Sequence, residues 1–407
     1  MSSESNRPSL MLPSADAVQP DHPAQWWYWS GQLRADSGRR YGFQTAFFAA
    51  EAVRGLLWGQ MAHWALVDLD AGEFASGSRI WLGAPERIEG RFALESPRGG
   101  VSAFGGGGRD RLRLRLGELE LDLRASGGPV VEHYEGRAHD YAFGGYSYYY
   151  SRPRMAGVGL IRRGATRESV RGEVWFDRQF GELSSALSEG WQWLSIHLED
   201  GEQLMLFSFN RERSERIAAI TDAQGRTRWL GPDEVRLEPI ERWTSPRSGI
   251  EYPCAWRLRT DAHQLELRAA LREQEMNGAA WLGPVYWEGA CEVSGSHRGV
   301  AYVELLGSLG SGLASATRID ASSSRLRRGL AKTLRHPTIA LGLATGVGHL
   351  AAHVAALRPS FADPSEAAIE SSGATIDLLL RRASQRSRAR ADELRERAPQ
   401  RRRAVGE

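Results

Sequence analysis

The sequence lacks the short motifs that mark the common catalytic and cofactor sites. Its 407 residues contain no HExxH, CxxC pair, Walker or GxSxG pattern. Metal, nucleotide and serine-hydrolase chemistry therefore have no support in the sequence. The run Gly105–Gly108 has no strand-to-helix context and no following Lys-Ser/Thr, which excludes a phosphate-binding loop. We predict neither a metal nor a cofactor.

Net charge, cysteines and leader signals are also scarce. A formal charge of +2 gives no overall field of the kind that indicates nucleic-acid binding. Cys254 and Cys291 lie in predicted strands, where they form either buried thiols or a disulfide. Residues 1–20 have no basic start followed by an apolar core, so they do not resemble a signal peptide. We expect a disordered arm there and a cytoplasmic protein.

Tryptophan and glycine, by contrast, are abundant. Fourteen Trp, 45 Gly and 17 Pro are typical of many short strands joined by tight turns. Alternating apolar runs predict strands at 191–198, 203–209, 255–260, 263–271, 285–293 and 300–306. Residues 111–126 predict a hairpin that turns near Gly117-Glu118 and has one apolar face. The sequence therefore predicts an all-β, antiparallel barrel or sandwich.

The segment 146–210 combines aromatic residues, one isolated acid and a hairpin signal. Asp200-Gly201 favours a type I′ turn, with Glu199 opposite Glu202. That register places Leu194, Ile196, Leu198, Met205, Phe207 and Phe209 on one face, and Trp191, Trp193, Ser195, His197, Leu204, Leu206 and Ser208 on the other. The second face has the mixed aromatic and polar character of an apolar ligand site. By the same alternation, Glu173, Trp175 and Asp177 share a face, as do Tyr146, Tyr148 and Tyr150.

Asp177 is the strongest candidate for catalysis. Desolvation beside indole rings raises the pKa of a carboxyl, which allows it to deliver a proton near neutrality. Protonation of an isolated alkene gives a cation that aromatic faces stabilise until water captures it. The structural alternative is an ion pair with Arg178 or Arg152, or a cap on the turn after Gly181.

Other polar groups lie in aromatic surroundings. Gln44 is the only strongly polar side chain of the apolar run 41–48 and must bind backbone or a ligand. His63 and Trp64 point to opposite faces, and His63 is expected to be a core or interface histidine. Glu288 follows Tyr286 on one face and is either a second acid or part of ordinary hydrogen bonding within the barrel. The predicted site comprises Asp177 and Tyr148 as catalytic groups, with Tyr146, Tyr150, Trp175, Trp191, Trp193, His197, Gln44, Tyr286 and Glu288 binding substrate.

After Gly307 the composition changes to Gly, Ser, Ala and Arg. Residues 325–335 contain five basic residues and no acid, and 338–357 contain no charged side chain. The uncharged segment is a packing helix, a membrane-surface helix with basic flanks or a weak membrane span. Residues 374–407 are typical of a charged helix followed by an Arg-rich tail. Peripheral membrane contact through this extension is therefore one hypothesis.

Several blocks resemble the AttH-type lipocalin-like family, which includes carotenoid 1,2-hydratases and proteins labelled predicted secreted hydrolases. They are DHPAQWWYWSGQL (21–33), YGFQTAFF (41–48), AHWALVDL (62–69), YYYSRPRM (148–155), GEVWFDRQFG (172–181), GWQWLSIHLEDG (190–201), SGIEYPCAW (248–256) and VYWEGACEVSG (285–295). The resemblance covers about 21–307. It implies two lipocalin-like barrel halves, at 21–186 and 187–307, followed by the extension 308–407.

The resemblance also implies a cofactor-free hydratase or cyclase that acts on an apolar isoprenoid or polyene-like substrate in a barrel cavity. In the family's carotenoid hydratases, an Asp follows a Tyr by two residues in the motif that contains Asp177. This sequence has Trp175 at that position. Their upstream His-x-Trp element corresponds to Tyr148–Tyr150 here. The alternative function is a non-catalytic carrier of lipophilic ligands.

Overall fold

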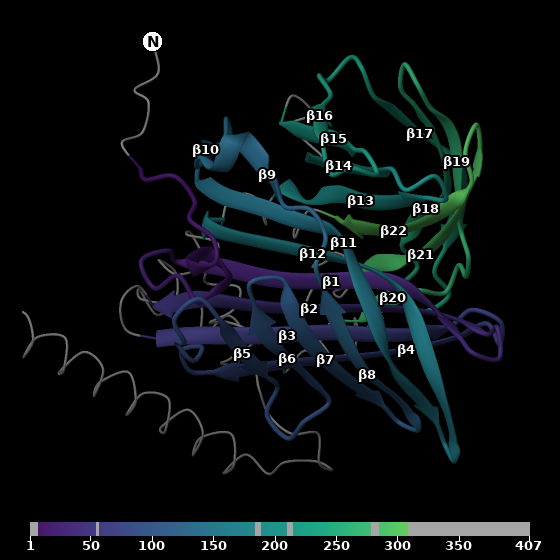
Figure 1. Ribbon diagram of the computed structural model, residues 1–407, viewed down its shortest axis with the longest axis horizontal. Helices are drawn as coiled ribbons and strands as arrows, with labels where there is room; N and C mark the ends of the chain where they lie inside the picture. The colour runs from purple at the N-terminus through teal and green to yellow at the C-terminus, as the bar shows by residue number, and fades with distance from the viewer. Residues whose placement is uncertain (1–6, 54–56, 184–188, 210–214, 278–284, 308–407) are drawn as a thin grey trace, which may run out of the picture. The chain divides into compact units, whose positions relative to one another are not determined.

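The computed structural model describes residues 7–53, 57–183, 189–209, 215–277 and 285–307. These residues belong to one compact unit, Met1–Ala351. They form two antiparallel sheets, each curled into a half-barrel (Figure 1). The predicted all-β fold with two lipocalin-like halves is therefore confirmed. The extension 308–407, and with it the predicted helices and membrane contact, lies outside the described residues.

The first sheet has twelve strands in the order β4-β3-β2-β1-β12-β11-β8-β7-β6-β5, with the short strands β9 and β10 also paired to β11. Their bounds are β1 Ala24–Ala35, β2 Arg40–Val53, β3 Leu57–Asp68, β4 Glu73–Leu82, β5 Phe92–Glu95, β6 Val101–Gly106, β7 Arg109–Leu116, β8 Leu119–Ser126, β9 Val131–Glu132, β10 His139–Asp140, β11 Tyr146–Arg163 and β12 Thr166–Glu182. Two short 3₁₀ helices, η1 Ser14–Asp16 and η2 His133–Gly136, precede β1 and follow β9.

The second sheet has ten strands in the order β16-β15-β14-β13-β22-β21-β19-β18-β17, with β20 paired to β21. Their bounds are β13 Trp191–Leu198, β14 Gln203–Phe209, β15 Arg216–Thr221, β16 Thr227–Trp229, β17 Arg236–Thr244, β18 Glu251–Arg259, β19 Gln264–Ala269, β20 Glu275–Asn277, β21 Val285–Gly295 and β22 Gly299–Leu306. The predictions for β13 and β14 match the observed bounds, and the other predicted strands differ from them by a few residues.

The two predicted hairpins have different outcomes. In the β7–β8 hairpin, Leu116 pairs with Leu119 across the two-residue turn Gly117-Glu118, as the alternation indicates. In the β13–β14 hairpin the predicted register is wrong by one residue, because Leu198 rather than Glu199 faces Glu202. The connection is a three-residue loop whose last residue, Gly201, has φ +91°.

That one-residue shift moves every β14 side chain to the other face. Trp193 now pairs with Phe207, and Leu194 pairs with Leu206. Met205, Phe207 and Phe209 therefore lie on the same face as Trp193, whereas Leu204 and Leu206 lie on the opposite face. The physical cause is the loop, since a three-residue connection replaces the expected two-residue turn.

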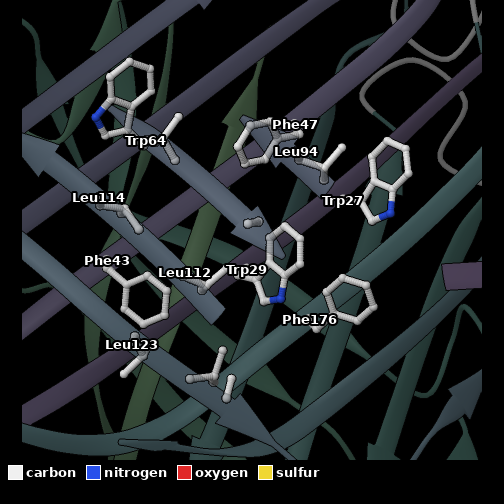
Figure 2. Close-up of a cluster of buried hydrophobic side chains, with 14 of the residues drawn as sticks. Trp27, Trp29, Phe43, Phe47, Trp64, Leu94, Leu112, Leu114, Leu123 and Phe176 are labelled. Carbon is white, nitrogen blue, oxygen red and sulfur yellow. The ribbon is translucent and has the colours of Figure 1, made fainter. Parts of the chain in front are cut away.

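Apolar side chains fill the concave side of each sheet. Figure 2 shows the first cluster, in which Trp27, Trp29, Phe43, Phe47 and Phe176 pack together. A second cluster, around Trp256 and Trp287, fills the other sheet. Full burial of such a side chain contributes roughly 1.5–3 kcal/mol. These two apolar clusters stabilise the two halves, and the candidate functional site lies outside them.

A third buried cluster joins side chains from both sheets, and we call it the intersheet layer. It contains Tyr28, Ala46, Ala65, Tyr141, Tyr149, Trp175, Leu183, Trp191, Trp193, Met205, Phe207, Phe209, Ile217, Met276, Tyr286, Ala290, Tyr302 and Leu306. Strand alternation explains it: on β1, Trp27 and Trp29 enter the first core, so Tyr28 faces the second sheet. β1 is thus covered on both sides.

The beginning of the described chain is packed rather than a disordered arm. Asp16 is fully buried, and its carboxylate pairs with Arg152 at 2.8 Å. Asp16 Oδ2 also accepts a hydrogen bond from the Gly107 backbone at 2.8 Å. The expectation of disorder over 1–20 is therefore wrong for residues 7–20. This segment is held by buried polar contacts.

Two remaining expectations concern cysteines and membranes. Cys254 and Cys291 are free, buried thiols, so the disulfide alternative is wrong. Among the described residues, no helix has the length and apolar character needed to cross a membrane.

Candidate functional site

Asp177 lies in the intersheet layer at the centre of β12. On this strand Val174 and Phe176 enter the first core, which turns Trp175 and Asp177 towards the second sheet. Pairing places Asp177 between Tyr28 of β1 and Ser151 of β11. The predicted cavity inside a barrel is therefore not where the structure puts these residues, because the concave sides are filled by apolar side chains.

Three donors hold the Asp177 carboxyl. The hydroxyl of Ser151 donates to Oδ1 at 2.5 Å, that of Tyr149 to Oδ2 at 2.7 Å, and Nε1 of Trp175 to Oδ1 at 2.7 Å. Asp177 is only 4% exposed. Burial raises the pKa of this carboxyl to about 6, although the three hydrogen bonds act in the opposite direction. Asp177 can therefore carry a proton close to neutral pH.

The arginines proposed as partners of Asp177 are engaged elsewhere. Arg152 pairs with Asp16. Arg178 donates to the backbone carbonyls of Ala15 and Ala17 and lies 3.8 Å from the centre of the Trp27 ring. The ion-pair interpretation of Asp177 is therefore wrong, because the neighbours of Asp177 in β11 and β12 turn their cationic ends to the other face.

A second layer of contacts fixes the donors of Asp177. Nε1 of Trp193 donates to the Tyr149 hydroxyl at 3.2 Å. Nε2 of His133 lies 2.8 Å from the Ser151 hydroxyl, and its ring stacks on Tyr149 with centroids 3.9 Å apart. Because Ser151 donates its single proton to Asp177, His133 Nε2 must be the donor to Ser151. Burial lowers the pKa of His133 to about 3, so its imidazole is neutral.

The second sheet contributes two more acids to the same layer. Glu288 on β21 pairs directly with Glu304 on β22. Nε1 of Trp191 donates to Glu304 Oε2 at 3.0 Å. Burial raises the pKa of Glu304 to about 7, and the charge of Asp177 adds to the shift. The pKa of Glu288 rises well above its usual range, first through burial and then through the charge of Glu304.

Several buried polar atoms around the layer have no hydrogen-bond partner within the described residues. They include Gln44 Oε1, His63 Nε2, His133 Nδ1 and the Tyr302 hydroxyl. A buried polar group left unpaired costs about 1–3 kcal/mol, and such groups are rare in native proteins. Their concentration here indicates that water or polar atoms of a ligand complete the site.

The comparisons with known proteins agree with this architecture. The family model described as AttH-like matches residues 3–308. The chain belongs to the AttH-like family. The crystal structure of a candidate AttH protein from Nitrosomonas europaea is 28% identical, with a TM-score of 0.62 over 75% of this chain and 98% of the other. Kievitone hydratase from Nectria haematococca is 18% identical, with a TM-score of 0.58 over 74% of this chain and 93% of the other. No curated protein sequence matches the chain.

Most of the predicted site residues of this AttH-like protein meet in the intersheet layer. Asp177, Trp175, Trp191, Trp193, Tyr286 and Glu288 are there. The amide of Gln44 reaches Met276 Sδ at 3.4 Å, and His63 Nδ1 lies 2.9 Å from the Tyr286 hydroxyl. His197 lies at the margin, where its Nδ1 is 2.9 Å from Glu173.

The tyrosines Tyr146, Tyr148 and Tyr150 do not reach Asp177. Tyr148 donates to the Pro8 carbonyl at 2.6 Å, Tyr150 donates to Asp16, and Tyr146 lies beside His22. The pairing of β11 with β12 explains why the predicted tyrosines are the wrong ones. Ser151 is opposite Asp177, so Tyr149, two residues before Ser151, lies on the same face as Asp177.

Sequence reasoning missed Tyr149, Ser151, His133 and Glu304. Alternation in the run AYVELL (301–306) could have indicated that Tyr302 and Glu304 share a face. His133 carried no such signal, because it lies in a short helix remote in sequence. Within the described residues, no group of three or more His, Cys, Asp or Glu side chains is arranged to hold a metal ion.

The raised pKa of Asp177 predicts a pH dependence of stability. A carboxyl whose folded-state pKa is raised stabilises the fold fully below its unfolded pKa, near 4, and this contribution is lost as pH rises through about 6. The lost contribution is on the order of 3 kcal/mol. Buried histidines with lowered pKa, such as His133, act oppositely as pH falls, so a matched comparison is needed.

We therefore expect wild type to lose stability between pH 4 and pH 7 relative to Asp177→Asn, which does not titrate. Urea unfolding of both proteins at several pH values measures the difference. A difference that stays constant over this range would show that Asp177 ionises at its ordinary pKa.

Proposed function

We propose that this AttH-like protein is a cofactor-free hydro-lyase, of hydratase or cyclase type, that protonates an alkene of an isoprenoid or polyene-like substrate. The observation that carries the proposal is the environment of Asp177. It is a buried carboxyl with no cationic partner in the part of the chain that the structure describes, surrounded by Trp175, Trp193 and Tyr149, with a pKa near 6. A general acid for neutral pH needs such an environment.

The contacts of Asp177 support the protonation step of a hydration. Asp177 transfers its proton to an alkene carbon, which leaves a carbocation and a carboxylate. The donors Ser151, Tyr149 and Trp175 already point at the carboxyl oxygens, and their hydrogen bonds strengthen as negative charge develops. Water then forms a C–O bond to the cation and loses a proton, which gives an alcohol.

Aromatic rings pack close to Asp177, and in the proposed reaction they stabilise the positive charge that develops beside it. The Tyr28 and Trp193 rings are 5.1 Å apart, and the Trp175 and Trp193 rings are 5.9 Å apart. Each ring presents electron density that stabilises a nearby cation by roughly 0.5–2 kcal/mol. A cation sheltered by such rings can also close a ring, which is why cyclisation belongs to the same proposal.

The relatives support the reaction class but not one substrate. The name of kievitone hydratase describes addition of water, and at 18% identity the likeness shows the fold alone. Carotenoid hydration in particular is not favoured, because Trp175 and the tyrosines replace the residues of that motif. The unpaired Gln44 and Tyr302 atoms favour a substrate that carries an oxygen as well as an alkene.

Incubation with geraniol in ¹⁸O-labelled water tests the proposal. We expect a product that has gained one hydrogen and one labelled hydroxyl at a trisubstituted alkene carbon, detected by mass spectrometry. Heat-unfolded protein serves as the control for spontaneous hydration. Saturable quenching of tryptophan fluorescence without any labelled or cyclised product would instead support the carrier of lipophilic ligands.

A further inference from the structure

The acids Glu288 and Glu304 form a pair on the second sheet that the action of Asp177 leaves unused. They are direct cross-strand neighbours, so their Cβ atoms are expected to be about 5 Å apart. Glu288 is 1% exposed, whereas Glu304 is only partly buried. Two carboxyls this close cannot easily both ionise, and such pairs share a proton.

This pair lies close to the side chains that contact Asp177. Trp193 is the strand neighbour of Glu304 on β13, and its indole donates to Tyr149, which donates to Asp177. Tyr28 and Tyr286 lie beside Glu288, and Tyr302 precedes Glu304 by two residues on the same face of β22. The groups facing Glu304 are thus acids, phenols and indoles, with no cation among the described residues.

We propose that Glu304, positioned by Glu288 and Trp191, is the base that takes a proton from the water attacking the substrate cation. This inference rests on the proposed function. As the water oxygen forms its bond to carbon, one of its O–H bonds breaks and the proton passes to Glu304. Asp177 has lost one proton and Glu304 has gained one, so both are restored by exchange with solvent and no other reactant is needed.

Three features select Glu304 over Glu288 for this role. Glu304 retains some exposure, which gives water access, whereas Glu288 is enclosed. Trp191 fixes Oε2 of Glu304 and leaves its second oxygen for the water. The pKa near 7 keeps Glu304 partly ionised at neutral pH, whereas burial and the neighbouring charge of Glu304 raise the pKa of Glu288 well above its usual range.

The test separates formation of the cation from its capture. Geraniol is incubated in D₂O with wild type, Glu304→Gln and Asp177→Asn, and both deuterium in recovered geraniol and hydrated product are measured. We expect Glu304→Gln to retain deuterium exchange while hydration falls about 10²-fold. Asp177→Asn should lose both. Glu275→Gln is the matched control. Glu275 is buried in the same sheet, but it is adjacent to Met276 of the layer and therefore faces the other side of the sheet.

Several outcomes would overturn the inference. If Glu304→Gln lowers exchange and hydration equally, or lowers neither, Glu304 is not the base. If wild type neither exchanges nor hydrates geraniol, the proposed function fails for this probe, and infrared titration of the carboxyl groups then decides the case of Glu304. A Glu304 band that titrates at the ordinary glutamate pKa would exclude it. A band titrating near neutrality, and shifting to lower pH in Asp177→Asn, would support the coupled acid–base site.

Discussion

Replacing Asp177 by Asn is expected to lower turnover by about 10²-fold or more while the protein stays folded. Asn keeps the shape of the side chain and can still accept hydrogen bonds from Ser151 and Trp175, but it has no acidic proton to give. The variant should also bind substrate, because the aromatic rings are unchanged. Turnover per folded molecule, together with the melting temperature and a binding titration, measures these effects.

Two adjacent tyrosines provide the control. Tyr149 donates to Asp177, and this hydrogen bond lowers the pKa of the carboxyl. Tyr149→Phe should therefore raise that pKa and shift the pH profile of turnover upwards. Tyr148→Phe should leave the profile unchanged, because Tyr148 contacts Pro8 on the other face. If Asp177→Asn lowers the melting temperature strongly and spares turnover, the carboxylate is structural.

Replacing Arg152 by Met is expected to destabilise the fold by about 3–5 kcal/mol, since it leaves a buried charge uncompensated. Asp16 is fully buried, and Arg152 supplies two of its hydrogen bonds, at 2.8 and 3.2 Å. Tyr150 and the Gly107 amide remain as neutral donors, which cannot replace the guanidinium charge. Urea unfolding at neutral pH measures the change.

An exposed ion pair of the same N-terminal segment offers a matched comparison. Arg7 pairs with Asp140 at 2.8 Å, with side chains 33% and 56% exposed. Arg7→Met should change the free energy of unfolding by less than about 1 kcal/mol. Equal effects of the two substitutions would contradict the view that Asp16 and Arg152 anchor residues 7–20 on the first half-barrel.

The alternation of apolar residues was enough to predict most of the strands and the shared face of Trp175 and Asp177. Trp175 and Asp177 share a face because they are two residues apart, and this holds in any register. Tyr148 and Tyr149 are a different case. They are adjacent tyrosines that point to opposite faces, so the sequence alone does not say which of them is on the face of Asp177. Only the pairing of β11 with β12, with its irregularity between Arg152 and Met155, decides which of them faces Asp177.

The location of the site was harder to predict than its members. Alternation separates two faces of a strand, but it does not say which face is concave. Both faces of β1 and β12 are aromatic, so either could line a ligand site. The partnership of Glu304 with Asp177 depends on the packing of two sheets, which no local pattern encodes. His133 likewise reaches the site from the short helix η2, which packs on β11, and its contact with Ser151 is between residues that are far apart in sequence.

The intersheet layer gives the two halves unequal and complementary parts in the proposed reaction. Residues up to Leu183 supply the acid, and residues from Trp191 onwards supply the base and the ring of Trp193. Neither half has a complete set, although each has a core of its own. If the halves were made as separate polypeptides, we therefore expect activity only after they associate, with a rate that depends on the concentration of both.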